Sequence, residues 1–252
     1  MKNPFLVPEL RELVKKKKFN ILKSFLEESH PKEIAEYICL LNPTEIWMIL
    51  GLTDIYTRVD IFKYFEIDVQ AELVSGSMRT HITELLKELS PDSRAELFLH
   101  LDKDVADRLL LRLPIGERAD IINLTSYHEQ TAGSIMTTDH ATLNENDTVE
   151  HAIRKVRKEA PSRETVYYIY VIDNFGKLIG FVSLEKLILA KPRQHIRNIM
   201  KREVIYAFTE DDREHAAKLI EEYDLLAIPI VDAMERLMGI ITYDDAIDII
   251  RE

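Results

Sequence analysis

The sequence lacks several features that would place it in a specialised class of protein. Cys39 is its one cysteine, which excludes an internal disulfide framework and a cysteine-rich metal site, and fits a reducing compartment. No stretch approaches the ~18 consecutive apolar residues of a membrane helix, and the first residues lack the apolar core of a signal peptide. The eight histidines are scattered, with no HExxH pattern, nucleophile elbow or phosphate-binding loop. We therefore expect a soluble chain that is not an enzyme.

The sequence also has too few basic residues to bind nucleic acid. It contains 33 lysines and arginines against 44 aspartates and glutamates, a net charge of −11. Neutralising a phosphate backbone needs clustered cations, so an acidic surface argues against nucleic acid as a partner. The same surface permits multivalent cations as ligands, and simple solubility is its other interpretation.

A repeat of short helices is predicted before residue 130. Residues 1–30 are apolar at helical spacing, and from there helix-start signals recur near positions 31, 43, 55, 67, 79, 91, 103 and 115. Pro31, Pro43 and Pro91 occupy first-turn positions, and Asn42 and Ser90 precede two of them as N-cap candidates. Helices of about two turns are marginal in water by themselves. We therefore predict that they stack into a compact superhelix.

A second repeat, at an offset of 59 residues, marks the remainder of the chain. Val171-Ile172-Asp173 matches Ile230-Val231-Asp232, Gly180 matches Gly239, and Ser183 matches Thr242. In the later copy the pattern predicts a strand at 204–208, a helix at 210–223, strands at 225–231 and 237–242, and a helix from 244 to 250. Duplicated modules of this kind commonly bury their sheets against each other.

These patterns predict three domains. The helical superhelix occupies residues 1–130, the first module residues 131–197 and the second module residues 198–252. The first boundary lies where the helical pattern breaks, between Ser126 and Met136. The fold class is thus α plus α/β.

The two modules resemble a tandem pair of CBS domains. The passages VIDNFGKLIGFVS and IVDAMERLMGIIT carry this likeness, although Glu235 in the second copy stands where the first has Gly176. The passage from Ala132 to Asp173, with AGSIMT at its start and TVYYIYVID at its end, resembles the MgtE family of magnesium transporters. LLKELSPDSRAELF in the helical part resembles the N domain of that family.

The resemblance implies a regulatory role in magnesium transport. In the family, Mg²⁺ bridges the N domain to the CBS domains and favours a compact closed state. Taken by themselves, the acids can also cap helices or solvate the surface, and Mg²⁺ uses one or two carboxylates per site. The residues that the resemblance makes metal ligands are Asp92, Glu96, Asp224 and Asp245, with Asp60 as a weaker match.

The alternative is a CBS module that responds to an adenine nucleotide. Gly239, Thr242 and Asp245 fit the G-x-x-(S/T)-x-x-D pattern with which many CBS domains hold adenosine nucleotides, the carboxylate taking the ribose hydroxyls. In the first copy Lys186 replaces that aspartate. Mg²⁺ is therefore the expected ligand, and ATP or AMP is the alternative one.

The resemblance also implies partners and a location. CBS pairs of the family form a homodimer, and its transmembrane pore follows the point where this sequence stops. The expected place is the cytoplasm, on the inner face of the cell membrane when the chain is part of a full-length transporter.

Overall fold

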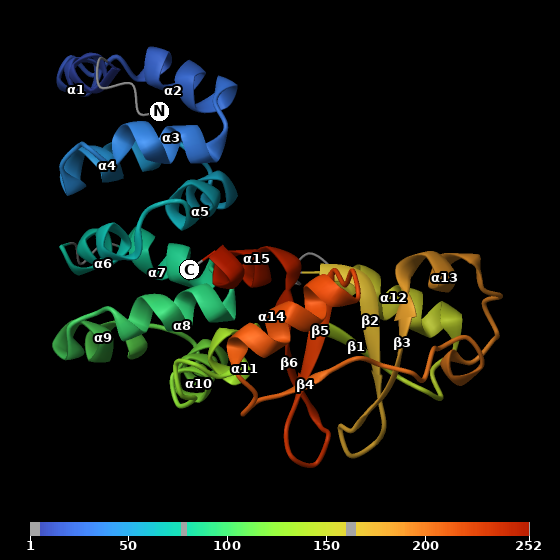
Figure 1. The fold of residues 1–252 in the computed structure, drawn as a ribbon. Helices are drawn as coiled ribbons and strands as arrows, with labels where there is room; N and C mark the ends of the chain where they lie inside the picture. Colours follow the sequence, from blue (N-terminus) through green and yellow to red (C-terminus); the bar gives the residue numbers. More distant parts are fainter. Residues whose placement is uncertain (1–5, 77–79, 160–164, 252) are drawn as a thin grey trace. The chain divides into compact units, whose positions relative to one another are not determined.

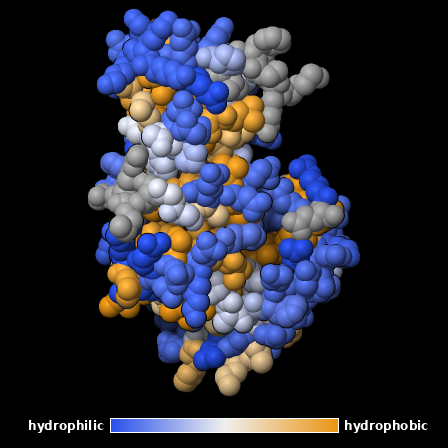
Figure 2. Space-filling model, turned by 90° about the vertical axis from the view of Figure 1, so that its left-hand side faces the viewer, coloured by the Kyte–Doolittle hydropathy of each residue, from blue (hydrophilic) through white to orange (hydrophobic). Residues whose placement is uncertain are grey.

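The chain divides into two compact units in the computed structural model, which describes residues 6–76, 80–159 and 165–251. Unit 1 comprises residues 1–89 and 93–118, and unit 2 comprises residues 90–92 and 119–252. In the space-filling view, hydrophilic residues cover most of the visible face and hydrophobic residues gather in patches (Figure 2). Among the described residues, every helix is too short or too polar to cross a bilayer.

Unit 1 consists of short helices that follow one another in stacked layers (Figure 1). The predicted helix starts are confirmed at seven positions, and the eighth, residue 79, lies outside the described residues, with its helix described from Thr80. The helices are α1 Leu6–Lys15, α2 Phe19–Glu28, α3 Pro31–Ile38, α4 Pro43–Leu50, α5 Ile55–Lys63, α6 Ile67–Ser75, α7 Thr80–Glu88, α8 Pro91–Leu99, α9 Lys103–Leu110 and α10 Ile115–Leu124. The first two residues of α8 and the last six of α10 belong to unit 2.

Local capping explains where these helices begin. The Asn42 Oδ1 atom accepts a hydrogen bond from the Glu45 amide at 3.0 Å, and the Glu45 carboxylate accepts one from the Asn42 amide at 3.3 Å. This reciprocal capping box confirms the predicted N-cap of α4. His30 caps α3 in the same way through Glu33, which confirms for this residue the prediction that the histidines of the helical part are surface or capping residues.

Buried polar side chains join neighbouring layers of unit 1. The Trp47 indole donates to the Leu73 carbonyl at 3.0 Å. The Arg58 guanidinium, only 8% exposed, donates to the carbonyls of Leu50 at 3.0 Å and Thr53 at 2.9 Å. Arg58 thereby adds a donor to the last carbonyl of α4, which also accepts from Thr53, and satisfies the Thr53 carbonyl beyond the helix.

Unit 2 contains two modules, each with a three-stranded sheet (Figure 1). The sheet orders are β1-β2-β3 and β4-β5-β6, and in each the first pair of strands is parallel and the second antiparallel. The elements are α11 Ala132–Ile135, β1 His140–Asn144, α12 Val149–Glu159, β2 Thr165–Ile172, β3 Leu178–Ser183, α13 Leu184–Leu189, the 3₁₀ helix Ile196–Asn198, β4 Ala207–Phe208, α14 Arg213–Glu222, β5 Ala227–Val231, β6 Leu237–Thr242 and α15 Tyr243–Arg251.

The offset of 59 residues is confirmed in the hairpins of the two modules. Asp173 Oδ1 accepts from the amides of Phe175 and Lys177, at 2.8 and 2.9 Å. Asp232 Oδ1 accepts from the amides of Met234 and Arg236, each at 2.9 Å. The repeated aspartate is therefore a turn residue that satisfies the backbone of its own hairpin.

The two hairpins also bind each other. The Leu178 amide donates to the Glu235 carbonyl at 2.9 Å, and the Lys177 ammonium lies 2.7 Å from the Glu235 carboxylate. The hydrogen bond to Glu235 raises the pKa of the Lys177 ammonium. Glu235 has φ +57° where Gly176 has φ +82°, so the residue that departs from the repeat keeps the left-handed backbone and adds an ion pair.

The segment before each module, its lead-in segment, pairs with the sheet of the other module. Thr137, which precedes the first sheet, exchanges backbone hydrogen bonds of 2.8 and 2.9 Å with Ile240 of β6. Lys201, which precedes the second sheet, exchanges two of 2.9 Å with Phe181 of β3. The close approach of these segments accounts for Gly180 and Gly239, where a Cβ would come within 2.7 Å of a backbone oxygen. The modules therefore complete each other.

The predicted burial of sheet against sheet is confirmed. One buried cluster joins Tyr170 and Leu178 of the first module to Ala227, Val231 and Ile240 of the second. The strand predicted at 204–208 is wrong in part, because β4 covers only Ala207 and Phe208. Lys201 is paired with β3, and the segment after it crosses between the sheets before pairing with β5 begins.

Candidate functional site

A cleft lies within unit 2 between the two modules, and its volume is about 120 Å³. Three segments line it, namely β2–β3, the extended stretch before β4, and β5 with the residues before it. The lining residues are Tyr168, Tyr170 and Phe181; Glu203, Val204 and Ile205; and Leu225, Ala227 and Pro229. Most of these side chains are apolar or aromatic, which is typical of small-molecule sites.

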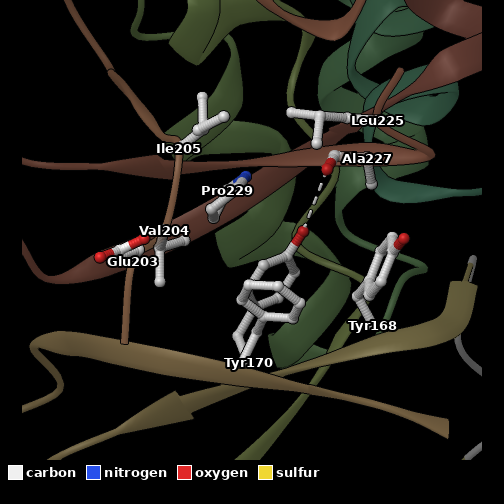
Figure 3. A pocket seen from close by; sticks show the side chains of 9 residues that line it. Tyr168, Tyr170, Glu203, Val204, Ile205, Leu225, Ala227 and Pro229 are labelled. Carbon is white, nitrogen blue, oxygen red and sulfur yellow. Dashed lines mark hydrogen bonds between the residues drawn. The ribbon is translucent and has the colours of Figure 1, made fainter. Parts of the chain in front are cut away.

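Tyr170 spans the cleft from the first module to the second. Its hydroxyl donates to the Ala227 carbonyl at 3.3 Å, and Figure 3 shows it directed across the space to that atom, with Tyr168 beside it. The side chain is 3% exposed, and burial raises the pKa of the phenol well above its ordinary value of 10. Tyr170 therefore stays protonated and holds the two modules together.

One edge of β5 faces the cleft with polar backbone groups. Pro229 is paired with Ile240 of β6 but has no N–H to donate. Because hydrogen-bonded and non-hydrogen-bonded pairs alternate along an antiparallel ladder, Ala227 and Pro229 direct their backbone groups away from β6. The Ala227 carbonyl, which accepts from Tyr170, fits this orientation. Since β4 pairs only with residues 230 and 231, it leaves this part of the edge uncovered.

A second, wider cavity of about 600 Å³ shares Tyr168 with the cleft. Its lining residues come from β2, from the start and the exposed side of α13, and from the residue before β5. They are Tyr167, Tyr168, Ser183, Leu184, Glu185, Ile188, Leu189 and Leu226. The cleft is thus a small apolar slot, and the cavity on the other side of Tyr168 is broader and partly polar.

The residues predicted to hold a nucleotide line neither cavity. The Thr242 hydroxyl donates to the Asp245 carboxylate at the start of α15, where Thr242 is buried and Asp245 half-buried. Of their counterparts in the first module, Ser183 lines the wider cavity, whereas Lys186 does not, although its neighbour Glu185 does. Ser183 Oγ accepts from the amide of Lys186 at 3.2 Å, so this part of the motif caps α13.

The acids predicted in the helical part lie on two helices. Asp60 is exposed on α5, and Glu96 is exposed on α8. Asp92 lies in the first turn of α8, half-buried, and accepts a hydrogen bond from the Ser90 hydroxyl at 3.3 Å. A carboxylate in the first turn is favoured by the helix dipole, so Asp92 has a local structural role whatever else it binds.

Asp224 is exposed and has a structural role of its own. It follows α14 with φ +51°, and the next amide, of Leu225, donates to the Ile220 carbonyl at 3.0 Å. This is the Schellman ending of a helix, in which the left-handed position is usually glycine. Among the residues that the structure describes, no three acids, histidines or cysteines are grouped closely enough to hold a metal ion.

The sequence interpretation missed the residues of the cleft. Tyr168 and Tyr170 are two apart on a strand, so alternation alone puts them on one face. Pro229 inside a strand pattern is a sign of an uncovered edge. These two signals were available, but the contribution of Ile205 and Leu225 depends on how the modules pair.

Comparison with protein families identifies two kinds of domain. A model described as the MgtE intracellular N domain matches residues 29–130. The CBS domain model matches twice, over residues 132–193 and 196–252. The chain is 34% identical over 248 residues to the magnesium transporter MgtE of Thermus thermophilus, covering 97% of this chain and 55% of that protein. It thus spans about half the length of this curated relative.

Solved structures match over nearly the full chain. A crystal structure of the cytosolic domain of the Mg²⁺ channel MgtE in complex with ATP has a TM-score of 0.89 and 34% identity, and covers 95% of this chain and 98% of that one. A structure of the soluble part of a magnesium transporter has a TM-score of 0.86 and 30% identity, and covers 97% and 96%. Both confirm the predicted fold class.

Proposed function

The chain belongs to the MgtE family of magnesium transporters, and we propose that it is the regulatory, non-catalytic region of such a transporter and senses Mg²⁺. The observation that carries the proposal is the match to the MgtE cytosolic domain over 95% of this chain and 98% of that structure. The proposed location is the cytoplasm, on the inner face of the membrane, with the transmembrane pore of the same protein as its partner.

The proposed mechanism rests on the acidic charge of the chain. A net charge of −11 repels itself in the absence of cations. We propose that Mg²⁺ bridges the N domain and the CBS domains and so favours a compact, closed state. The proposed ligands are Asp92, Glu96 and Asp60 of the helical part, and Asp224 and Asp245 of the CBS pair.

The chemistry of the donors suits this ion. Mg²⁺ is a hard cation that keeps several waters and uses one or two carboxylates, which is the donor set that these separated acids offer. Linkage requires that the compact state bind Mg²⁺ more tightly than the open one.

Small-angle scattering of the chain during a Mg²⁺ titration tests this mechanism. The radius of gyration is expected to fall as Mg²⁺ rises to tens of millimolar. Asp224→Asn removes the charge and tolerates the left-handed backbone, and Asp224→Gly removes the charge and relaxes that backbone. Both variants are expected to lose much of the Mg²⁺-dependent fall in the radius of gyration. Because they share only the loss of charge, this result would assign the fall to the Asp224 carboxylate. Asp104→Asn on α9 is the control and retains the fall. A radius that stays constant in the unmutated chain contradicts the proposal.

We further propose a homodimer through the CBS pair. Apolar side chains are exposed on α13, at Ile188 and Leu189, and on α15, at Tyr243 and Ile250. Exposed apolar patches of this kind mark interfaces between proteins. Light scattering of Ile188→Asp and Ile250→Asp, beside the unmutated chain, tests the dimer. The unmutated chain is expected to be a dimer, and at least one of the two variants is expected to be a monomer. An unmutated chain that is monomeric refutes the proposed dimer.

A second proposed function is the binding of an adenine compound in unit 2. The specific observation is the apolar cleft with an uncovered backbone edge, together with the ATP bound to the structural relative. Calorimetry of the chain with ATP or AMP, with and without Mg²⁺, tests it, and Tyr168→Ala is expected to abolish any heat of binding. An absence of binding to ATP and AMP refutes the adenine site and leaves the magnesium proposal unaffected.

A further inference from the structure

Five exposed lysines lie where α1 ends and α2 begins. Residues 13–26 contain no acid, and their cations are Lys15, Lys16, Lys17, Lys18 and Lys23. The two helices pack on each other at one end of unit 1 (Figure 1). In a chain with a net charge of −11, this corner is a local exception in sign. We call these five residues the lysine corner.

The described part of the chain leaves most of this positive charge unneutralised. Lys16 forms an ion pair of 2.6 Å with Glu12, which is itself exposed. The other four lysines form no ion pair with any residue that the structure describes. The acids of α2, Glu27 and Glu28, lie at its opposite end. The corner is therefore a surface that an anionic partner can neutralise.

The charges of α2 are arranged against its helix dipole. A helix is stabilised by acids near its N-terminus and by cations near its C-terminus. α2 has the reverse arrangement, because its first turn contains no acid, lysines precede it, and Glu27 and Glu28 end it. Lys18 occupies the N-cap position, and its side chain makes no capping hydrogen bond. The best caps are serine, threonine, aspartate and asparagine, so the lysine has a cost in helix stability.

Lys17 is a second locally unfavourable choice. It has φ +53° directly after α1. Its amide donates to the Val14 carbonyl at 3.1 Å, and the amide of Lys18 donates to the Leu13 carbonyl at 2.9 Å. This is a Schellman ending, whose left-handed position is usually glycine because a Cβ is strained there. Departures from local rules are expected where a function requires the residues concerned.

From these observations we infer that the lysine corner binds the anionic surface of a lipid bilayer. The inference rests on the proposed location beside a membrane and adds a contact to it. An anionic leaflet attracts lysines and repels the acidic remainder of the chain as a whole, which orients the corner towards the surface. Ile21 follows Lys18 by about one helical turn, is 54% exposed, and suits the boundary between headgroups and acyl chains.

This contact depends on Mg²⁺ in the opposite sense to the proposed bridges between domains. Mg²⁺ screens an anionic surface and is repelled by the lysines. The contact of unit 1 with the membrane is therefore strongest when Mg²⁺ is scarce, which is when the bridges to the CBS domains are absent.

Sedimentation of the full chain with lipid vesicles tests the inference. Vesicles of phosphatidylcholine that contain phosphatidylglycerol are expected to bind the chain, and vesicles of phosphatidylcholine alone are not. Binding is expected to fall as Mg²⁺ is added. A lysine at such a surface is worth a roughly fivefold change in affinity, so Lys17→Gly with Lys18→Ser is expected to weaken binding about 25-fold.

The stability of the same variant separates binding from folding. Lys17→Gly relieves the left-handed backbone, and Lys18→Ser supplies a cap for α2. The unfolding midpoint is therefore expected to rise by a few degrees when it is measured by the fluorescence of Trp47, the one tryptophan, which is buried in unit 1. A lower midpoint would contradict the reasoning from the helix dipole and the left-handed backbone.

Two further variants complete the test. Lys15→Gln with Lys23→Gln leaves the Schellman ending and the N-cap unchanged, and is expected to weaken binding to the same extent. Lys63→Gln with Lys87→Gln, on α5 and α7, changes the net charge equally and is expected to retain binding. An equal loss of binding in this control overturns the inference.

Two other results also overturn it. One is an unmutated chain that does not bind the anionic vesicles. The other is a chain that binds a short DNA duplex and not the vesicles, which would assign the corner to a soluble polyanion. A radius of gyration that still falls with Mg²⁺ in either case leaves the magnesium proposal standing.

Discussion

Gly239→Ala tests the exchange of lead-in segments between the two CBS modules. A Cβ at residue 239 would lie 2.7 Å from the Thr137 carbonyl oxygen and 2.8 Å from the Met136 sulfur. Thr137 is 1% exposed and its backbone is paired with Ile240, so it cannot move away freely. The substitution must displace the lead-in segment of the first module from the sheet of the second.

The expected loss can be estimated from two effects. Overpacking a close contact costs about 1–3 kcal/mol, and weakening a hydrogen bond costs about 1 kcal/mol. Together they give a loss of roughly 2–4 kcal/mol in the free energy of unfolding of unit 2. For a chain of this size that corresponds to a fall in Tm of roughly 5–15 °C.

Thermal unfolding with two probes measures this loss. Far-UV circular dichroism reports on both units, whereas Trp47 is the one tryptophan and lies buried in unit 1. Gly239→Ala and Gly180→Ala are expected to lower the dichroism transition and to change the Trp47 fluorescence transition little. Gly116→Ala is the control, because its added Cβ meets nothing within 4 Å and alanine is the better helix residue. A Gly239→Ala midpoint equal to that of Gly116→Ala refutes the reasoning.

Three further changes have defined outcomes. Glu235→Gly is expected to raise the unfolding free energy slightly in urea, because relief of the left-handed backbone is worth about 1 kcal/mol and the exposed pair with Lys177 is worth little; a clear loss would show that the pair matters more. Tyr170→Phe is expected to lower stability by about 1–3 kcal/mol near neutral pH, since it leaves the Ala227 carbonyl without its partner. Because the folded pKa of Tyr170 is raised, its contribution is present below pH 10 and is lost as pH rises further, so the variant should lose less stability than the unmutated chain in that range. Arg58→Met is expected to cost about 1–3 kcal/mol by the Trp47 probe, because the Thr53 carbonyl loses the Arg58 donor and the Leu50 carbonyl keeps only the donors of Thr53, and an unchanged midpoint would contradict this.

The repeats of the sequence predicted much of the fold for physical reasons. Helix starts near 31, 43 and 91 could be located because proline in the first turn and a capping residue before it act locally. The strand–turn–strand pattern at 225–242 could be located because alternation and turn residues are also local. Such features depend on a few neighbouring residues and need no knowledge of the tertiary structure.

What the sequence did not predict depends on how distant segments meet. Position 239 signals a tight contact only once Thr137, about a hundred residues earlier, lies on it. The left-handed backbone at Glu235 and Asp224 could not be predicted from these residue types, because glycine is the usual residue in that conformation. The candidate cleft belongs to this second class: its walls come from three segments, and the motif chosen from the sequence lies outside it.

Because each module completes the other, the cleft between their sheets exists only while they are paired. A ligand in it therefore stabilises the pair by mass action. An adenine compound at a hundred times its Kd contributes about 2.7 kcal/mol to unit 2. That is close to the loss expected for Gly239→Ala, so the compound should restore most of the Tm of this variant if the lead-in segment returns to its place. If the variant instead holds the modules apart, the compound will bind more weakly and restore less. The size of the rescue thus measures how far the cleft depends on the exchanged segments, and a variant that binds the compound as tightly as the unmutated chain yet gains no Tm would refute this linkage.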